Sequence, residues 1–320
     1  MSKVLLLLFV FHVMTASATE ALNLSQTIAL LVENTLTSSL SLISTLFVAY
    51  SMVYLRLLAK GISHQMIFCL LCCSFVNQCV VLATLFILQM SQMVADNTCK
   101  FFAAVMQFTD LSQCFWVLAI AVHIGISYFV QNTFIKKNYF VISNIFVWGS
   151  SLVLSIIPID DYGMSEVWCT TTNKYWDFFT LYIVVAIVAV IVFVIYIAVI
   201  IQLVVSDKNL KLRHLFAKLD YENGLNGRVI SLIRKMAIYP LLYIACWLIP
   251  FIDRLVPLFG DDIQVVLKYI HCFTIPLLGF MNCLYYAKDV SLMVRWRIYF
   301  RNWGMCYSCI GNGEEIIPDD

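Results

Sequence analysis

Seven stretches of the chain are long and apolar enough to cross a membrane, and this feature limits the fold more than any other. A spanning helix needs about 20 mostly apolar residues, and lipid offers no partner to exposed backbone groups, so each stretch must be helical. Only 12% of the 320 residues are charged, about half the share found in soluble domains. We therefore predict an all-α membrane protein, a bundle of seven transmembrane helices. The expected spans are Leu36–Leu58, Gln65–Leu88, Phe101–Val130, Tyr139–Ile157, Phe178–Val205, Val229–Phe251 and Val265–Ala287.

Residues 1–18 have the layout of a secretory signal peptide. Lys3 precedes a short apolar run, and small residues end at Ala18. Such a run is too short to span a membrane. We expect cleavage after Ala18, which would leave residues 19–35 as an extracellular segment; an uncleaved anchor is the alternative. The sequon Asn23-Leu24-Ser25 then predicts glycosylation of Asn23.

The basic residues indicate the orientation, because they are retained on the cytoplasmic side of spanning helices. With the N-terminus outside, the inner loops and the tail hold most of the 20 lysines and arginines. We therefore expect a multi-pass protein of the plasma membrane, with the bundle at residues 36–287 and the cytoplasmic tail at residues 288–320. In the mature chain, the segments placed outside keep only Lys100, Lys174, Arg254 and Lys268.

Two cysteines are expected to form a disulfide on the outer side. Cys99 opens the third span and Cys169 lies in the loop between the fourth and fifth, on the side where disulfides persist. The bridge would pin this loop across the mouth of the bundle; two free thiols are the alternative. Acidic residues also gather outside, either because they are tolerated there or because they attract cationic ligands. They are Asp96, Asp160, Asp161, Glu166, Asp177, Asp253, Asp261 and Asp262.

Polar residues inside the spans indicate a candidate ligand site. Ionisable groups are costly in a membrane and usually face the interior of a bundle. Gln107 and Asp110 lie in the third span, where Asp110 suits either the floor of a pocket or a hydrogen-bond network with the amides of the second span. Trp247 lies between Pro240 and Pro250, in a span that the prolines should bend. We take Gln107, Asp110 and Trp247 as candidate ligand-binding residues.

The segment after the last span predicts an amphipathic eighth helix on the inner leaflet. Leu292, Trp296 and Tyr299 share one helical face. Cys306 and Cys309 follow and are candidate lipidation sites.

Basic residues of the inner loops form a candidate docking surface for a cytoplasmic partner. Ordinary retention of positive charge on the inner side is the alternative explanation. The residues are Lys136, Lys137, Lys211, Arg213, Lys218, Arg228, Arg234 and Lys235.

Several patches of the sequence resemble one group of receptors. Cys114–Val122 and Val167–Cys169 resemble slime-mould cyclic AMP receptors and their relatives. Tyr239–Arg254 is similar to their sixth helix, and Ile275–Tyr286 to the seventh helix of the broader group that includes fungal glucose-sensing receptors. The resemblance implies a G-protein-coupled receptor that binds an extracellular ligand and activates a heterotrimeric G protein.

The chain departs from the rhodopsin class of such receptors at two motifs. Residues 126–129 lack the arginine of that class's Asp/Glu-Arg-Tyr, and residues 282–286 lack the proline of its Asn-Pro-x-x-Tyr. The few basic residues outside also argue against cyclic AMP, because its phosphate needs cationic partners.

The sequence shows no catalytic constellation, phosphate-binding glycine loop or metal triad, and a net charge of +1 does not indicate nucleic acid. We therefore expect a receptor and not an enzyme, with no cofactor. Its expected partners are a heterotrimeric G protein, membrane lipid and an extracellular ligand that the sequence leaves open. The alternative is a seven-helix transporter or channel, which repeated halves would favour; no such repeat is visible.

Overall fold

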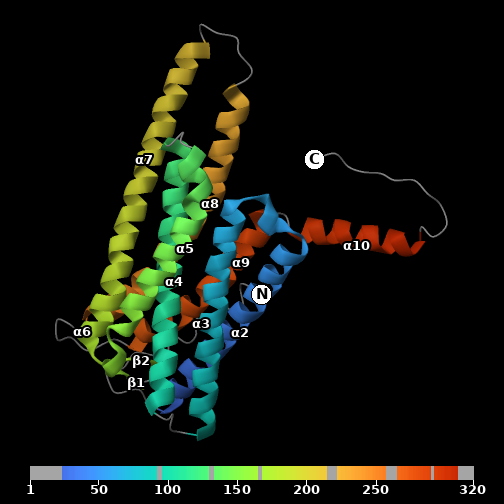
Figure 1. The fold of residues 1–320 in the computed structure, drawn as a ribbon. Coiled ribbons are helices and arrows are strands. Elements are labelled where there is room, and N and C mark those ends of the chain that lie inside the picture. Colours follow the sequence, from blue (N-terminus) through green and yellow to red (C-terminus); the bar gives the residue numbers. More distant parts are fainter. Residues whose placement is uncertain are drawn as a thin grey trace.

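The computed structural model describes residues 24–91, 96–129, 133–164, 168–214, 222–256, 265–289 and 292–308. Within these ranges, seven helices are long and apolar enough to span a membrane. They pack side by side as a bundle, and a further helix leaves the bundle sideways near the C-terminus (Figure 1). The predicted fold class, seven transmembrane helices followed by a short eighth helix, is confirmed.

The bundle helices are α2 (Leu24–Tyr54), α3 (Ile62–Ser91), α4 (Asp96–Phe129), α5 (Thr133–Ile156), α7 (Ile183–His214), α8 (Glu222–Leu255) and α9 (Val265–Asp289). The shorter elements are the 3-10 turns η1 (Leu57–Lys60) and η2 (Ile159–Asp161), strands β1 (Tyr162–Met164) and β2 (Cys169–Thr171), helix α6 (Lys174–Asp177), the π-helical segment η3 (Phe178–Tyr182) and helix α10 (Leu292–Ser308). We call the end of the bundle that carries the strands the disulfide end, and the opposite end the α10 end.

The first helix begins earlier than the sequence predicted. The expected start was Leu36, but α2 begins at Leu24. Asn34 is completely buried, and Leu30 packs in a cluster with Val81 of α3. The polar residues of this turn therefore face the interior of the bundle, where they do not end a span.

Helix α4 supplies the centre of the core. Its side chains Leu111, Trp116 and Ile120 are completely buried, and it contacts α3, α5, α7 and α8. The hydroxyl of Tyr139 in α5 donates a hydrogen bond to the Ala119 carbonyl at 2.7 Å. Because lipid is as apolar as the side chains, close packing and such interhelical hydrogen bonds hold the bundle together.

Helices α2, α3 and α9 approach one another closely at Gly279. A Cβ atom at this position would collide with the hydroxyls of Ser41 and Ser74. Small residues allow membrane helices to bring their backbones together. The three helices therefore pack closely at this level of the bundle, and the packing leaves no room for a side chain at residue 279.

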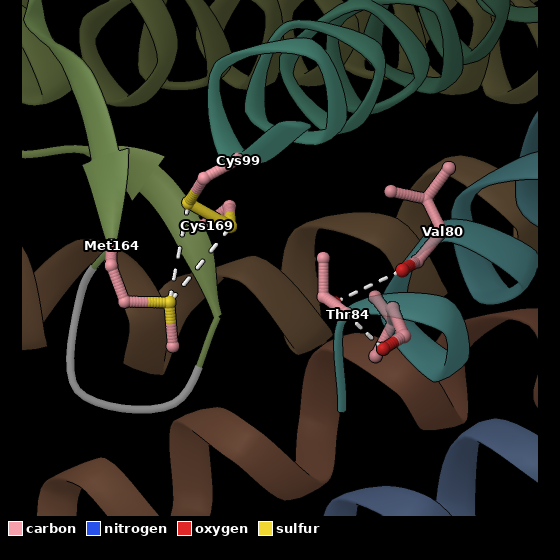
Figure 2. Close-up of a disulfide and its surroundings, with 6 residues drawn as sticks. Val80, Thr84, Cys99, Met164 and Cys169 are labelled. Carbon is pink, nitrogen blue, oxygen red and sulfur yellow. Dashed lines mark hydrogen bonds between the residues drawn. A yellow bond between two sulfur atoms is a disulfide. The ribbon is translucent and has the colours of Figure 1, made fainter. Parts of the chain in front are cut away.

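At the disulfide end, β1 and β2 form an antiparallel hairpin that is fastened to α4. Met164 pairs with Cys169 in the register of the strands, and Cys169 is bonded to Cys99 with their Cα atoms 5.2 Å apart. The Met164 sulfur lies 4.0 Å from Cys99 Sγ and 3.9 Å from Cys169 Sγ (Figure 2). The hydroxyl of Tyr162 donates to the Ser155 carbonyl at 2.7 Å, and burial raises the pKa of this tyrosine. The predicted disulfide is confirmed, and the hairpin is anchored at both strands.

Helix α10 is held against α2 by aromatic side chains. Trp296 Nε1 donates to Ser51 Oγ at 3.0 Å, and its ring stacks on Tyr54 with 5.5 Å between centroids. Tyr299 meets Tyr54 edge to face at 5.2 Å. These contacts fix the direction in which α10 leaves the bundle.

A second contact at the α10 end joins α3 to α9. His64 Nδ1 lies 2.9 Å from the hydroxyl of Tyr286, and the two rings meet edge to face at 5.9 Å. Tyr286 is almost completely buried, so this hydrogen bond joins α3 and α9 in the interior of the bundle at the α10 end.

Candidate functional site

A small cavity lies at the disulfide end, among α3, α4, η3, α8 and α9. The space in it that is open to the centres of water molecules is about 40 Å³. One buried water needs roughly 10–15 Å³ of such space, so the cavity admits a few waters in this conformation. Its polar lining residues are Asn77, Gln107, Asp110, Thr170, Asp177, Arg254 and His271, and its aromatic ones are Trp168, Tyr182 and Trp247.

The α4 side of the cavity is a hydrogen-bonded polar wall. Asn77 Nδ2 of α3 donates to Asp110 Oδ1 at 2.8 Å and to Thr109 Oγ1 at 2.9 Å. Asp110 therefore joins the network with α3 that the sequence suggested as one of two possibilities, and it lines the cavity as well. One amide thus holds the carboxylate in place beside an open space.

Gln107 connects α4 to a widened turn at the start of the fifth span. Its Nε2 donates to Thr180 Oγ1 at 2.9 Å, and Thr180 donates in turn to the carbonyl of Trp176 at 2.7 Å. Thr180 belongs to η3, which has π-helical geometry. Single π-helical turns inside α-helices frequently lie at functional sites.

Trp247 lies at the aromatic side of the cavity and is only 3% exposed. Its ring lies 5.8 Å from Tyr182 and 5.7 Å from Tyr243, between centroids. Within the described residues, its Nε1 has no hydrogen-bond partner. Pro240 and Pro250 both lie inside α8, and each removes a backbone hydrogen bond and favours a bend. The tryptophan therefore sits on the part of α8 that is easiest to deform.

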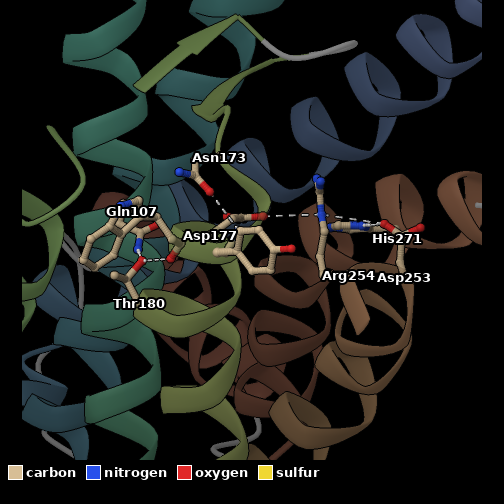
Figure 3. A network of polar contacts seen from close by, with 9 residues as sticks. Gln107, Asn173, Asp177, Thr180, Asp253, Arg254 and His271 are labelled. Carbon is tan, nitrogen blue, oxygen red and sulfur yellow. Dashed lines mark hydrogen bonds and ion pairs between the residues drawn. The ribbon is translucent and has the colours of Figure 1, made fainter. Parts of the chain in front are cut away.

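Four ionisable side chains, which we call the charge network, run beside the cavity (Figure 3). His271 Nδ1 lies 2.7 Å from Asp253 Oδ2. Arg254 Nε lies 3.8 Å from the same oxygen and 3.6 Å from Asp177 Oδ2. Asp177 ends α6, Asp253 and Arg254 lie in the last turn of α8, and His271 belongs to α9. The network therefore ties three separate segments together.

The positions of the two carboxylates differ from those expected from the sequence. Asp177 and Asp253 were expected on an acidic outer surface, but their side chains are only 5% and 3% exposed. A charge removed from water is tolerated only when it is paired; Arg254 supplies a cation to both carboxylates, and His271 Nδ1 lies within hydrogen-bond distance of Asp253. Sequence reasoning missed this network because its members are far apart along the chain. The adjacent Asp-Arg pair near the end of an apolar span was the signal that could have revealed it.

The structure brings the three candidate ligand residues together. Gln107, Asp110 and Trp247 all line this cavity, although a ligand contact by any of them stays a prediction. Residues 1–18, Asn23, Lys218 and Cys309 lie outside the described residues. The roles of the other residues predicted for the inner face also stay predictions. Their positions are Lys136 and Lys137 in α5, Lys211 and Arg213 in α7, Arg228, Arg234 and Lys235 in α8, and Cys306 in α10.

The arrangement of the helices is that of a known receptor fold. The crystal structure of squid rhodopsin superimposes with a TM-score of 0.70 over 88% of this chain and 88% of that chain, at 13% sequence identity. At this identity the likeness establishes the fold alone. The chain is thus a multi-pass membrane protein with the fold of a G-protein-coupled receptor.

One segment of the chain also matches a known protein family. Residues 227–289 match the C-terminal part of a family described as the G protein-coupled glucose receptor regulating Gpa2. Over this one segment, the match confirms the resemblance of the sixth and seventh helices to that group of receptors. No curated protein sequence matches the chain.

Proposed function

We propose that the chain is a cell-surface receptor that binds a small extracellular ligand at the disulfide end and activates a heterotrimeric G protein at the α10 end. This places the N-terminus and the β1–β2 hairpin outside the cell, as the distribution of basic residues favours. The observation that carries the proposal is the position of Trp247, which lines the cavity and lies between two prolines of α8.

The proposed mechanism is a change in the shape of α8. The cavity has room for only a few waters, so a larger ligand must displace Trp247 and the tyrosine rings that contact it. Because α8 is a continuous helix from Glu222 to Leu255, such a displacement is carried toward its N-terminal half, which contains Arg234 and Lys235. The ligand shifts the equilibrium by as much as its affinity differs between the two shapes.

The family match suggests which ligand and partner to test first. The name of that family refers to glucose and to Gpa2, and the matched segment includes Arg228, Arg234 and Lys235 of the candidate docking surface. A hexose is larger than a few waters, so its binding requires the cavity to widen. Gln107, Asp110 and Trp247 are the side chains that we expect it to contact.

The proposal is tested by nucleotide exchange on purified Gα subunits, including a Gpa2-type subunit, in membranes that contain the protein, with and without glucose. We expect glucose to raise exchange, and Trp247→Phe to weaken this response about two- to tenfold, since aromatic contacts contribute about 0.5–1.5 kcal/mol. Trp148→Phe is the matched control, because Trp148 stacks on Phe108 and does not line the cavity. Equal responses in the two variants would contradict the proposed pocket.

The partner surface has its own test. Replacing Arg234 and Lys235 together by Ala is expected to lower exchange at every glucose concentration, because these residues belong to the proposed docking surface and lie in the N-terminal half of α8, away from the cavity-lining Trp247 and Arg254. The midpoint for glucose should change little. Absence of exchange with every Gα, together with solute uptake or current in the same membranes, would instead favour the transporter.

A further inference from the structure

We infer that the disulfide end contains a proton-binding site at His271, which makes the proton a second ligand of the receptor. The observation behind this is an imbalance of charge in the charge network. One guanidinium, Arg254, faces the two carboxylates of Asp177 and Asp253. When both carboxylates are ionised and the imidazole is neutral, the network carries one negative charge more than its guanidinium balances.

The geometry allows His271 to supply the missing charge. Its Nδ1 lies 2.7 Å from Asp253 Oδ2, and both side chains are at most 6% exposed. The other carboxylate oxygen, Oδ1, is buried and has no hydrogen-bond partner among the described residues. Buried charges are stable only when they are paired and hydrogen-bonded, so the carboxylate gains from an imidazolium at this distance.

The charges that act directly on His271 oppose one another, because the carboxylate of Asp253 favours an imidazolium and the guanidinium of Arg254 disfavours it. Further charged groups lie on the other elements packed nearby. Burial disfavours the imidazolium and nearby carboxylates favour it, and histidine commonly changes its charge between roughly pH 5 and 8. Glu33 of α2 and Lys268 of α9 act on the neighbouring Cys272, and Asp177 of α6 acts on Asp110 of α4.

The proton would act on the same elements that surround the cavity. His271 and Arg254 both line it, and the ring of Trp168 lies 5.9 Å from the His271 ring. Trp168 directly precedes Cys169, which the disulfide fastens to α4. An imidazolium attracts the π-system of the indole and the carboxylate of Asp253, so protonation would strengthen the contacts of α9 with α8 and with Trp168.

The first test reads proton binding without any G protein. A protonated imidazole quenches a neighbouring indole, so the tryptophan fluorescence of the purified full-length protein is measured from pH 8 to pH 5. We expect one single-proton step in the wild type. The step should be lost in His271→Gln, which can still hydrogen-bond to Asp253, and in Trp168→Phe. It should persist in His64→Gln, whose histidine pairs with Tyr286 at the opposite end. A wild type without a step, or an unchanged step in His271→Gln, would overturn the inference.

The second test rests on the proposed function. The glucose midpoint of nucleotide exchange should shift with pH in the wild type, by at most about tenfold per pH unit for one coupled proton, and become independent of pH in His271→Gln. The same pH dependence in both proteins would overturn the coupling. Exchange that is flat at every pH would contradict the receptor function, and the fluorescence step would still decide the proton site.

Discussion

The two ends of the bundle are held together by different chemistry. At the disulfide end, a covalent bridge and a buried network of two carboxylates, a guanidinium and an imidazole connect α4, α6, α8, α9 and the hairpin. At the α10 end, the contacts described above are stacked rings and single hydrogen bonds between side chains without a fixed charge, such as the bond from Trp296 to Ser51.

This difference has an energetic consequence. A buried charge that loses its partner keeps its full desolvation cost, whereas a neutral hydrogen bond contributes only about 0.5–1.5 kcal/mol net. Single substitutions should therefore be far more damaging at the disulfide end than at the α10 end. The disulfide end is also where a ligand or a proton can change the balance of charge.

The largest effect is expected for Arg254→Met. It leaves Asp177 and Asp253 buried without their cation, so the free energy of unfolding should fall by about 3–5 kcal/mol. Denaturation of the purified protein in detergent measures the loss. The double variant Arg254→Met/Asp177→Asn removes one of the two orphaned charges and should recover part of it. A single variant as stable as the wild type would show that the charge network does not hold this end.

Removal of the disulfide should cost nearly as much. The variant Cys99→Ala/Cys169→Ala frees the hairpin from α4, and the loss of a native bridge typically costs about 2–4 kcal/mol. Thermal unfolding in detergent is the measurement. Cys79→Ala is the control, because Cys79 is a free, half-buried cysteine of α3. If the control and the double variant melt together, the bridge is not what stabilises the disulfide end.

Gly279→Ala probes the packing between the two ends. The new methyl group would collide with Ser41 and Ser74, and overpacking typically costs about 1–3 kcal/mol. Gly149→Ala in α5 is the matched control, since nothing lies near its Cβ position; alanine should stabilise that helix by up to about 1 kcal/mol. The melting temperature is expected to fall in Gly279→Ala and to rise in Gly149→Ala. A change in the same direction in both variants would contradict the close approach of α2, α3 and α9 at Gly279.

The smallest effect is expected at the α10 end. Tyr286→Phe removes the hydrogen bond to His64 and keeps the ring, so the free energy of unfolding should fall by only about 0.5–1.5 kcal/mol. The same denaturation assay compares it with Tyr50→Phe, whose exposed ring stacks on Tyr54. A loss as large as that of Arg254→Met would remove the distinction between the two ends.

The sequence predicted the bundle well because hydropathy depends only on local composition. It placed seven spans, the eighth helix and the disulfide, and it gathered Gln107, Asp110 and Trp247 for one site. It misplaced the start of α2, because the polar Asn34 lies inside this helix. Asn34 is buried against neighbouring helices, and local sequence does not show which residues are buried in this way. It also placed Asp253 and Arg254 in a loop, because a charge at the end of a span looks solvated until its partners are known.

The π-helical turn η3 divides the fifth span into two parts with separate registers. Each residue of an α-helix advances the side-chain direction by about 100°, so one residue added to a turn rotates everything before it relative to everything after it. Asp177 precedes this turn. Thr180, which accepts the hydrogen bond from Gln107, lies within it. A deletion of one residue between Phe178 and Tyr182 would therefore turn Asp177 away from Arg254 while the packing of α7 stayed as it is. The residues that face the cavity can thus diverge among related proteins without any change in the membrane span below them.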